Sequence, residues 1–269
     1  MGRRSASNLD GSCHSPEPAC RAPGRRPAGL KLAISAIFLC VFQSAYPPAH
    51  GAPDTPAFTD SIAQRALACT GCHGRQGRAA SDGYYPRIAG KPAGYLYNQL
   101  LNFRDDRRNY PLMTHLVQHL SDDYLQELAR YFADLDLPYP PPAPAAQTAA
   151  AFERGRQLVL AGEQGRAIPA CIECHGPTLT GVAPAIPGLL GLPRDYLNSQ
   201  FGAWRIGQRK ALEPDCMAQV ARQLHPDDIA ALTGWLAAQP VPAASRAALA
   251  LPAPMPLPCG GVPATPAVE

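Results

Sequence analysis

The sequence lacks a strong excess of charge of either sign. Its 269 residues carry 24 Lys and Arg against 21 Asp and Glu, which gives a formal net charge of +3. The basic residues are dispersed, which argues against a nucleic-acid-binding surface. No glycine recurs at every third position, so collagen is excluded despite 31 prolines and 23 glycines. The length suits two cores of ordinary domain size.

Long hydrophobic runs are scarce, and the main one lies near the N-terminus at residues 30–42. It is shorter than the ~20 apolar residues that a transmembrane helix needs. Arginines precede it and Ala49-His50-Gly51 follows it, which is the pattern of a secretory signal peptide. We predict that residues 1–51 are a signal peptide cleaved after Gly51 and that the protein is periplasmic. An uncleaved membrane anchor is the alternative.

Cysteine stands out among the residues that are present. Removal of residues 1–51 leaves six of the nine cysteines in an oxidising compartment. Four of these six lie in two copies of the string Cys-x-x-Cys-His-Gly, at residues 69–74 and 171–176. The segment 95–104 also matches 196–205 at nearly the same offset. The chain is therefore a tandem duplication.

The duplication predicts two domains, at residues 55–136 and 151–239. Between them, residues 137–150 are rich in proline and alanine and carry no charge, which predicts an extended linker. Residues 240–269 form a second Pro/Ala-rich segment that has too little apolar surface to fold alone. We expect this tail to lie over a domain or to be disordered.

Apolar spacing predicts that each copy is a small all-α domain. Residues 93–107 and 193–208 have apolar positions three and four apart, as amphipathic helices do. Each copy also ends in an amphipathic helix, which we expect to begin after Ser121 in the first copy and at His225-Pro226 in the second. No strand alternation of useful length is present.

Cys-x-x-Cys-His is the attachment signature of a c-type haem in an exported protein. The two thiols form thioethers with the haem vinyl groups, and the adjacent histidine becomes the proximal ligand of the iron. A zinc site, a thioredoxin-like redox pair and a structural disulfide are the alternatives. Neither copy has further ligands at zinc-finger spacing or a βαβ pattern. We therefore predict two covalent haem c groups, with Cys69, Cys72, Cys171 and Cys174 as attachment residues and His73 and His175 as axial ligands.

Methionine is rare, and its positions suggest the second axial ligand of each iron. Met113 and Met217 occur once per copy, whereas Met255 lies in the tail. A methionine is ordinarily a filler of gaps in a core, but its recurrence at matching positions favours ligation. His115 and His119 lie close to Met113 and could replace it, although neither has a counterpart in the second copy. Filling both axial positions with His and Met favours electron transfer over oxygen or peroxide chemistry.

At these residues the sequence resembles class I cytochromes c, and its doubled arrangement resembles the dihaem c-four type cytochromes of bacterial respiratory chains. The resemblance covers 55–136 and 151–239. It implies two tandem cytochrome c-like helical domains with one covalent haem each and two haems close together across a domain interface. It also implies that Pro86 and Pro187 shape the loop on the proximal side of each haem.

Two arginines recur at matching positions, Arg104 and Arg205, each followed one helical turn later by another, Arg108 and Arg209. Such residues ordinarily lie on a solvated helix face. Their recurrence supports a second interpretation, in which Arg104 and Arg205 form charge-assisted hydrogen bonds with the haem propionates. Contact of Arg104 and Arg205 with the propionates is therefore a hypothesis.

The two remaining cysteines of the exported chain are Cys216, which adjoins Met217, and Cys259 in the tail. A disulfide between them would hold the tail near the ligand loop of the second haem. Two independent thiols are the alternative, because sequence alone gives no Cα separation.

These observations predict an exported electron-transfer protein rather than an enzyme. Its expected partners are redox proteins, namely a quinol-oxidising membrane complex or a dehydrogenase as donor and a terminal oxidase as acceptor. Membrane association through a partner or an uncleaved signal is consistent with the sequence, and nucleic acid is not an expected partner. The alternatives are a haem subunit bound permanently to a dehydrogenase, and a dihaem peroxidase or thiosulfate-oxidising enzyme with an open iron position.

Overall fold

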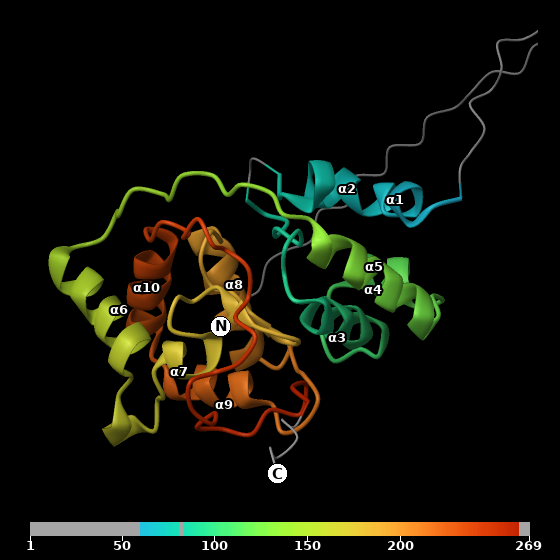
Figure 1. Cartoon of the computed structure of the whole chain (residues 1–269). Helices are drawn as coiled ribbons and strands as arrows, with labels where there is room; N and C mark the ends of the chain where they lie inside the picture. Colours follow the sequence, from blue (N-terminus) through green and yellow to red (C-terminus); the bar gives the residue numbers. More distant parts are fainter. Residues whose placement is uncertain (1–59, 81–82, 264–269) are drawn as a thin grey trace, which may run out of the picture. The chain divides into compact units, whose positions relative to one another are not determined.

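The computed structural model describes residues 60–80 and 83–263 (Figure 1). The predicted signal peptide, residues 1–51, and its cleavage after Gly51 lie outside the described residues. All described residues belong to one compact unit. Within them, no helix has both the length and the apolar character needed to cross a bilayer.

Helices account for most of the regular structure in both copies, as the sequence predicts (Figure 1). The first copy contains α1 (Ile62–Arg65), α2 (Leu67–His73), η1 (Arg75–Gly77), α3 (Ala93–Arg104), α4 (Pro111–Val117) and α5 (Asp122–Asp134). The second copy contains α6 (Ala149–Ala161), η2 (Gln164–Arg166), α7 (Cys171–His175), α8 (Arg194–Arg205), α9 (Cys216–Gln223) and α10 (Pro226–Ala237).

The closing helices begin where their sequence signals predict. The side chain of Ser121 accepts a hydrogen bond from the backbone N–H of Tyr124 at the start of α5. At the start of α10, Pro226 occupies the first turn and Asp228 accepts from the backbone N–H of His225. These contacts satisfy backbone donors that a helix leaves unpaired in its first turn.

Two features differ from the predicted elements. α3 and α8 end three residues earlier than expected, because the chain turns through positive φ values at Asp106 and Gly207. The second copy also contains a small antiparallel pair of strands, β1 (Gly181–Val182) and β2 (Ile186–Pro187). Each strand has two residues, which is too short to produce an alternating pattern in the sequence.

Each copy packs its helices around its own buried side chains. In the first copy, α3 packs against α5 around Leu96 and Phe132. In the second copy, α6 packs tightly against α10, and a Cβ atom at Gly155 would lie 2.2 Å from the carbonyl oxygen of Ala231. This close approach requires glycine at position 155.

The segment between the copies contacts both of them. Arg87 donates hydrogen bonds to the carbonyl oxygens of Leu137 and Pro138, and its guanidinium lies 3.9 Å from the centre of the Tyr139 ring. A Cβ atom at Gly191 in the second copy would meet the same ring at 2.3 Å. Tyr139 thus packs between a cation of one copy and a glycine of the other.

The described part of the tail lies against the second copy. The backbone N–H of Ala183 donates to Ala248, and that of Ala248 donates to Gly181, at 2.8 and 2.9 Å. These bonds extend the small strand pair by a parallel bridge. The expectation that the tail lies over a domain therefore matches residues 240–263.

Candidate functional site

A cavity of about 990 Å³ is lined by residues of both copies and of the tail. Its lining contains most residues that the sequence predicts as haem ligands or attachment points: Cys69, Cys72, His73, Met113, Cys174, His175 and Met217. Cys171 is absent from the lining, although its side chain packs against the core of the second copy. The fold thus gathers residues from distant parts of the chain into one apolar cavity.

Both histidines end a short helix and are held by the same kind of contact. Nδ1 of His73 lies 2.8 Å from the carbonyl oxygen of Pro86, and Nδ1 of His175 lies 2.7 Å from that of Pro187. Because a carbonyl oxygen only accepts, each Nδ1 carries the hydrogen and each Nε2 retains its lone pair. Metal-bound histidines ordinarily show this arrangement. The two prolines therefore also orient the histidines, a role that sequence reasoning missed.

Burial favours the neutral form of both rings. It lowers the pKa of His73 and of His175, and this effect outweighs the backbone hydrogen bonds that raise the two values. Nearby cations lower both values further, Arg108 at His73 and Lys91 at His175. A neutral imidazole is the form that binds a metal ion.

All four motif cysteines are partly buried, and three of them have raised thiol pKa values. Burial raises the pKa of Cys69, and it raises the pKa of Cys171 to about 12 and that of Cys174 to about 11. The cysteines of a redox-active Cys-x-x-Cys pair have lowered pKa values instead. None of the four motif cysteines forms a disulfide in the structure. These features do not fit a thioredoxin-like pair or a structural disulfide.

The two methionines occupy comparable short helices, Met113 in α4 and Met217 in α9. Both are partly buried, each packs against the core of its own copy, and both line the cavity. His115 and His119 are exposed and lie outside the lining. Of the candidates near α4, Met113 alone therefore faces the cavity.

The structure does not bring the predicted propionate contacts, Arg104 and Arg205, into the cavity lining. Arg104 forms ion pairs with Asp122 at 2.6 Å and with Asp105 at 3.2 Å, and Arg205 is exposed. Both are the last residues of their helices, α3 and α8.

The following arginine of each copy, Arg108 and Arg209, lines the cavity instead. The two form an antiparallel backbone bridge between the copies. The Arg108 guanidinium donates to Gln99 of its own copy and to Gln200 and Tyr196 of the second copy. The Arg209 guanidinium donates to Gln200 of its own copy and to Gln99 and Tyr95 of the first copy.

These two arginines carry positive charge that no carboxylate balances. Arg209 is 6% exposed, and among the described residues neither Arg209 nor Arg108 forms an ion pair. Burial lowers the pKa of Arg209, and the charge of Arg108 lowers it further. A buried cation without a counter-ion costs free energy. The cavity is therefore suited to an anionic group beside these arginines.

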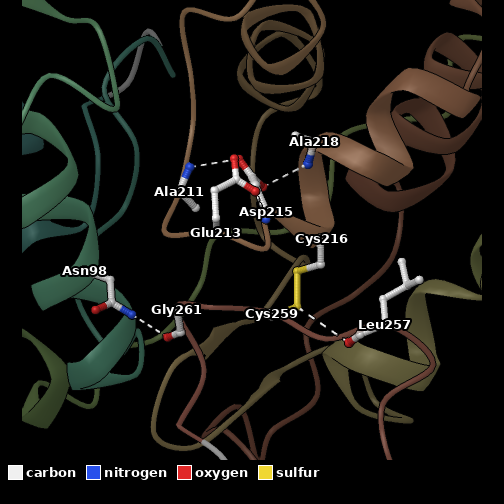
Figure 2. The surroundings of a disulfide bond; sticks show 9 residues. All are labelled: Asn98, Ala211, Glu213, Asp215, Cys216, Ala218, Leu257, Cys259 and Gly261. Carbon is white, nitrogen blue, oxygen red and sulfur yellow. Dashed lines mark hydrogen bonds between the residues drawn. A yellow bond between two sulfur atoms is a disulfide. The ribbon is translucent and has the colours of Figure 1, made fainter.

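Cys216 and Cys259 form a disulfide, with a Cα separation of 5.1 Å (Figure 2). Cys216 opens α9 directly before Met217, so the bond holds the tail against the start of that helix. The backbone N–H of Gly260 donates to Pro214 at 3.0 Å.

The tail beyond the disulfide reaches the first copy. Asn98 of α3 donates a hydrogen bond from Nδ2 to the carbonyl oxygen of Gly261 at 2.6 Å (Figure 2). Met255, Leu257 and Val262 line the cavity. The tail is therefore part of the cavity wall, which the sequence alone did not indicate.

No protein-family model matches the chain. It is similar to the thiosulfate dehydrogenase electron acceptor of Thiomonas intermedia, with 38% identity over 186 residues, or 69% of this chain and 85% of that protein. It is also similar to cytochrome c4 of Pseudomonas aeruginosa, with 32% identity over 192 residues, or 70% of this chain and 90% of that protein.

Two solved structures are similar in fold. Reduced recombinant cytochrome c4 from Pseudomonas stutzeri matches with a TM-score of 0.55 and 27% identity, over 65% of this chain and 95% of that chain. The thiosulfate dehydrogenase of Marichromatium purpuratum matches with a TM-score of 0.58 and 34% identity, over 66% of this chain. The matched region spans 38% of that longer chain.

Proposed function

The chain belongs to the cytochrome c4 family of dihaem electron carriers, and from this premise we propose that it accepts electrons from a thiosulfate-oxidising dehydrogenase and passes them to a respiratory oxidase in the periplasm. Its fold is the all-α fold of these cytochromes, and its cofactors are two covalently bound haem c groups. We also propose residues 55–136 and 151–239 as the two haem domains. The helix-free stretch between Asp134 and Ala149 supports this division.

We assign one haem to each copy. Cys69 and Cys72, with axial His73 and Met113, hold the first; Cys171 and Cys174, with axial His175 and Met217, hold the second. A bound haem c supplies a one-electron ferric and ferrous couple. The observation that carries this assignment is the pair of matching Nδ1 contacts to Pro86 and Pro187, which leave each Nε2 available for iron.

Arg108 and Arg209 are our candidates for binding the haem propionates, in place of Arg104 and Arg205. Guanidinium groups form bidentate charge-assisted hydrogen bonds with carboxylates. Arg209 is buried and Arg108 is half-buried, both line the cavity, and neither has a carboxylate partner among the described residues, which supports this role. Arg108 and Arg209 both hydrogen-bond to Gln99 and Gln200, so the two guanidinium groups lie close together, which also supports this role.

The donor assignment rests on the relatives. Proteins from Thiomonas intermedia and Stutzerimonas stutzeri that match this chain at 38% and 37% identity are named as electron acceptors of thiosulfate dehydrogenase. The test is stopped-flow mixing of the oxidised protein with a catalytic amount of a thiosulfate dehydrogenase and thiosulfate. We expect rapid reduction of both haems, and no reduction by thiosulfate alone. Failure of the enzyme to accelerate reduction would overturn the donor assignment.

A second candidate function is that of a permanently bound haem subunit. It is favoured by the Marichromatium purpuratum enzyme, in which the matching region is part of a longer chain that is itself named a thiosulfate dehydrogenase. Size-exclusion chromatography of the mixed proteins distinguishes the two functions. A mobile carrier elutes separately from the enzyme, whereas a subunit co-elutes with it.

A further inference from the structure

Lys91 is a buried lysine at the junction of the two copies. It is 5% exposed, and it lies in the turn that precedes α3 of the first copy. The whole sequence contains only two other lysines, Lys31 and Lys210, and Lys210 is exposed. Lysine is among the residues that are least often fully buried in proteins. Its burial here therefore calls for a physical explanation.

The ammonium group of Lys91 reaches the second copy. Its Nζ donates a hydrogen bond to the carbonyl oxygen of Gly188 at 3.1 Å. Gly188 directly follows Pro187, the residue whose carbonyl oxygen accepts from Nδ1 of His175. Lys91, Gly188 and His175 all line the cavity. A cation of the first copy thus lies beside the loop that orients the proximal histidine of the second haem.

No negative charge offsets this cation within the part of the chain that the structure describes. Lys91 forms no ion pair there, and its hydrogen-bond acceptor is a neutral carbonyl. The charged group that acts on it is another cation, Arg87, which donates to three backbone carbonyls, hydrogen-bonds to the Tyr139 side chain and lies within the field of Asp136. The charge of Lys91 also acts at the His175 ring, where it lowers the pKa of the imidazole.

The second copy does not supply a matching cation to the first copy. At the offset that aligns Gly90 with Gly191, Lys91 corresponds to Leu192 and Arg87 corresponds to Gly188. The second copy therefore offers no cation at these positions to the first. His73 has a nearby cation from its own copy, Arg108.

We propose that Lys91 of the first copy raises the reduction potential of the second haem by holding a positive charge beside its proximal side. This inference rests on the proposed assignment of His175 as an iron ligand. Ferric haem carries one more positive charge than ferrous haem, so a nearby cation disfavours the oxidised form. Burial strengthens the effect, because the effective dielectric constant is lower than in water. Lys91 thus makes the driving force for electron transfer between the haems depend on contact between the copies.

The test is a spectroscopic redox titration of the full dihaem protein and of Lys91→Met, with Lys210→Met as the matched control. We expect Lys91→Met to lower the potential of the second haem and to leave that of the first unchanged. Lys210→Met should shift neither. An unchanged second potential, or an equal shift of both potentials, would overturn the proposal.

Two further measurements separate a charge effect from a packing defect and from a wrong ligand assignment. Lys91→Arg keeps the charge, so its second-haem potential should stay closer to that of wild type than the potential of Lys91→Met does. Equal shifts in both variants would contradict the proposal.

Paramagnetic NMR assigns each potential to a haem through its axial methionine signals. If the wild-type protein shows no His/Met signature for the second haem, the ligand assignment made under the proposed function is wrong. An intact signature with an unmoved potential refutes the role of Lys91 alone.

Discussion

Single residues form the proposed ligand environment of each iron, and methionine is the clearest case. Met113 and Met217 line the cavity from equivalent short helices, each within its own copy. The recurrence of Cys-x-x-Cys-His and of one methionine per copy was visible in the sequence. The orienting role of Pro86 and Pro187 was not, because a backbone carbonyl leaves no signal in residue type.

Exchange of Met113 for Leu should affect the first haem only. Loss of the thioether sulfur removes one axial ligand, and its contribution to a high reduction potential, from a single iron. We expect the sulfur-to-iron charge-transfer absorption to fall by about half, while the second haem keeps its potential. Met255→Leu is the control, since Met255 lines the cavity from the tail and is assigned no ligand role. Loss of ligation at both haems would contradict two separate haem sites.

Lys91 should also reduce the stability of the folded protein at neutral pH. Burial and the charge of Arg87 lower its pKa from 10.5 to about 8, so below that value the fold holds a charged, desolvated lysine. Lys91→Met should therefore stabilise the protein near pH 7 by about 2 kcal/mol, allowing for the lost hydrogen bond.

The sign of the pH dependence follows from proton binding. Between about pH 8 and 10.5 the unfolded chain binds a proton at Lys91 that the folded chain does not, so wild-type stability rises with pH in this window. The advantage of Lys91→Met should shrink over the same window. Urea unfolding at pH 7 and pH 10 measures both effects. An advantage that is constant with pH would show that the charge of Lys91 is not its cause.

The recurring arginines show how much helical spacing can predict about the cavity lining. Arg104 and Arg108 lie one turn apart in the sequence pattern, and both recur in the second copy. α3 and α8 end at Arg104 and Arg205, however, so the later arginines lie beyond the helices and meet across the two copies. The point at which a helix ends depends on tertiary contacts that periodicity does not contain.

Among the elements, α6, η2 and α10 are joined by one ion-pair network around Asp228. Its carboxylate accepts from Arg154 at 2.8 Å and from Arg166 at 2.7 Å, and both arginines also contact Glu163. Burial raises the pKa of Asp228, but the hydrogen bonds from Arg166 and Arg154 outweigh it and leave the value lowered.

Asp228→Asn should destabilise the fold by about 2–3 kcal/mol at pH 7, because it removes a buried charge partner of two arginines. Since the folded-state pKa is lowered, wild type should lose this contribution as the pH falls through that value. Thermal unfolding at pH 7 and pH 3 measures the difference. Glu153→Gln is the control, since its pair with Arg156 is exposed and should contribute nothing measurable. Equal effects of the two variants would contradict the network.

The disulfide makes the tail a fixed element of the second copy. It joins residues 43 positions apart, and its loss should cost about 4 kcal/mol on the chain-entropy model. Cys216→Ser with Cys259→Ser should therefore lower the urea midpoint and weaken the Met217 charge-transfer band more than the Met113 band. Non-reducing peptide mapping should recover the 216–259 link. Recovery of both residues as alkylated free thiols would contradict it.

At the scale of the whole molecule, the two copies are joined by contacts that the duplication did not predict. Sequence reasoning found two helical copies, an extended segment between them and a tail, because periodicity and composition are local properties. It did not find that Tyr139 packs between the copies or that Lys91 reaches Gly188. These contacts join residues far apart in the chain, and a single sequence carries no signal of such pairing.

At the same scale, the contact between the copies gives the proposed carrier function its physical basis. One cavity contains the predicted ligands of both irons, and the Arg108 and Arg209 cluster lies between the copies. Under the proposed ligand assignment, we expect electrons that enter at one haem to pass to the other within the protein, without release to a partner. We propose that both irons are six-coordinate and serve only to transfer electrons.

The most direct test is a combined optical and low-temperature magnetic spectrum of the purified mature protein, followed through a redox titration and repeated with added peroxide. We expect two low-spin His/Met haems, two one-electron transitions and no reaction with peroxide. A high-spin haem, or one that reacts with peroxide, would make one copy catalytic and would contradict the assignment of its methionine.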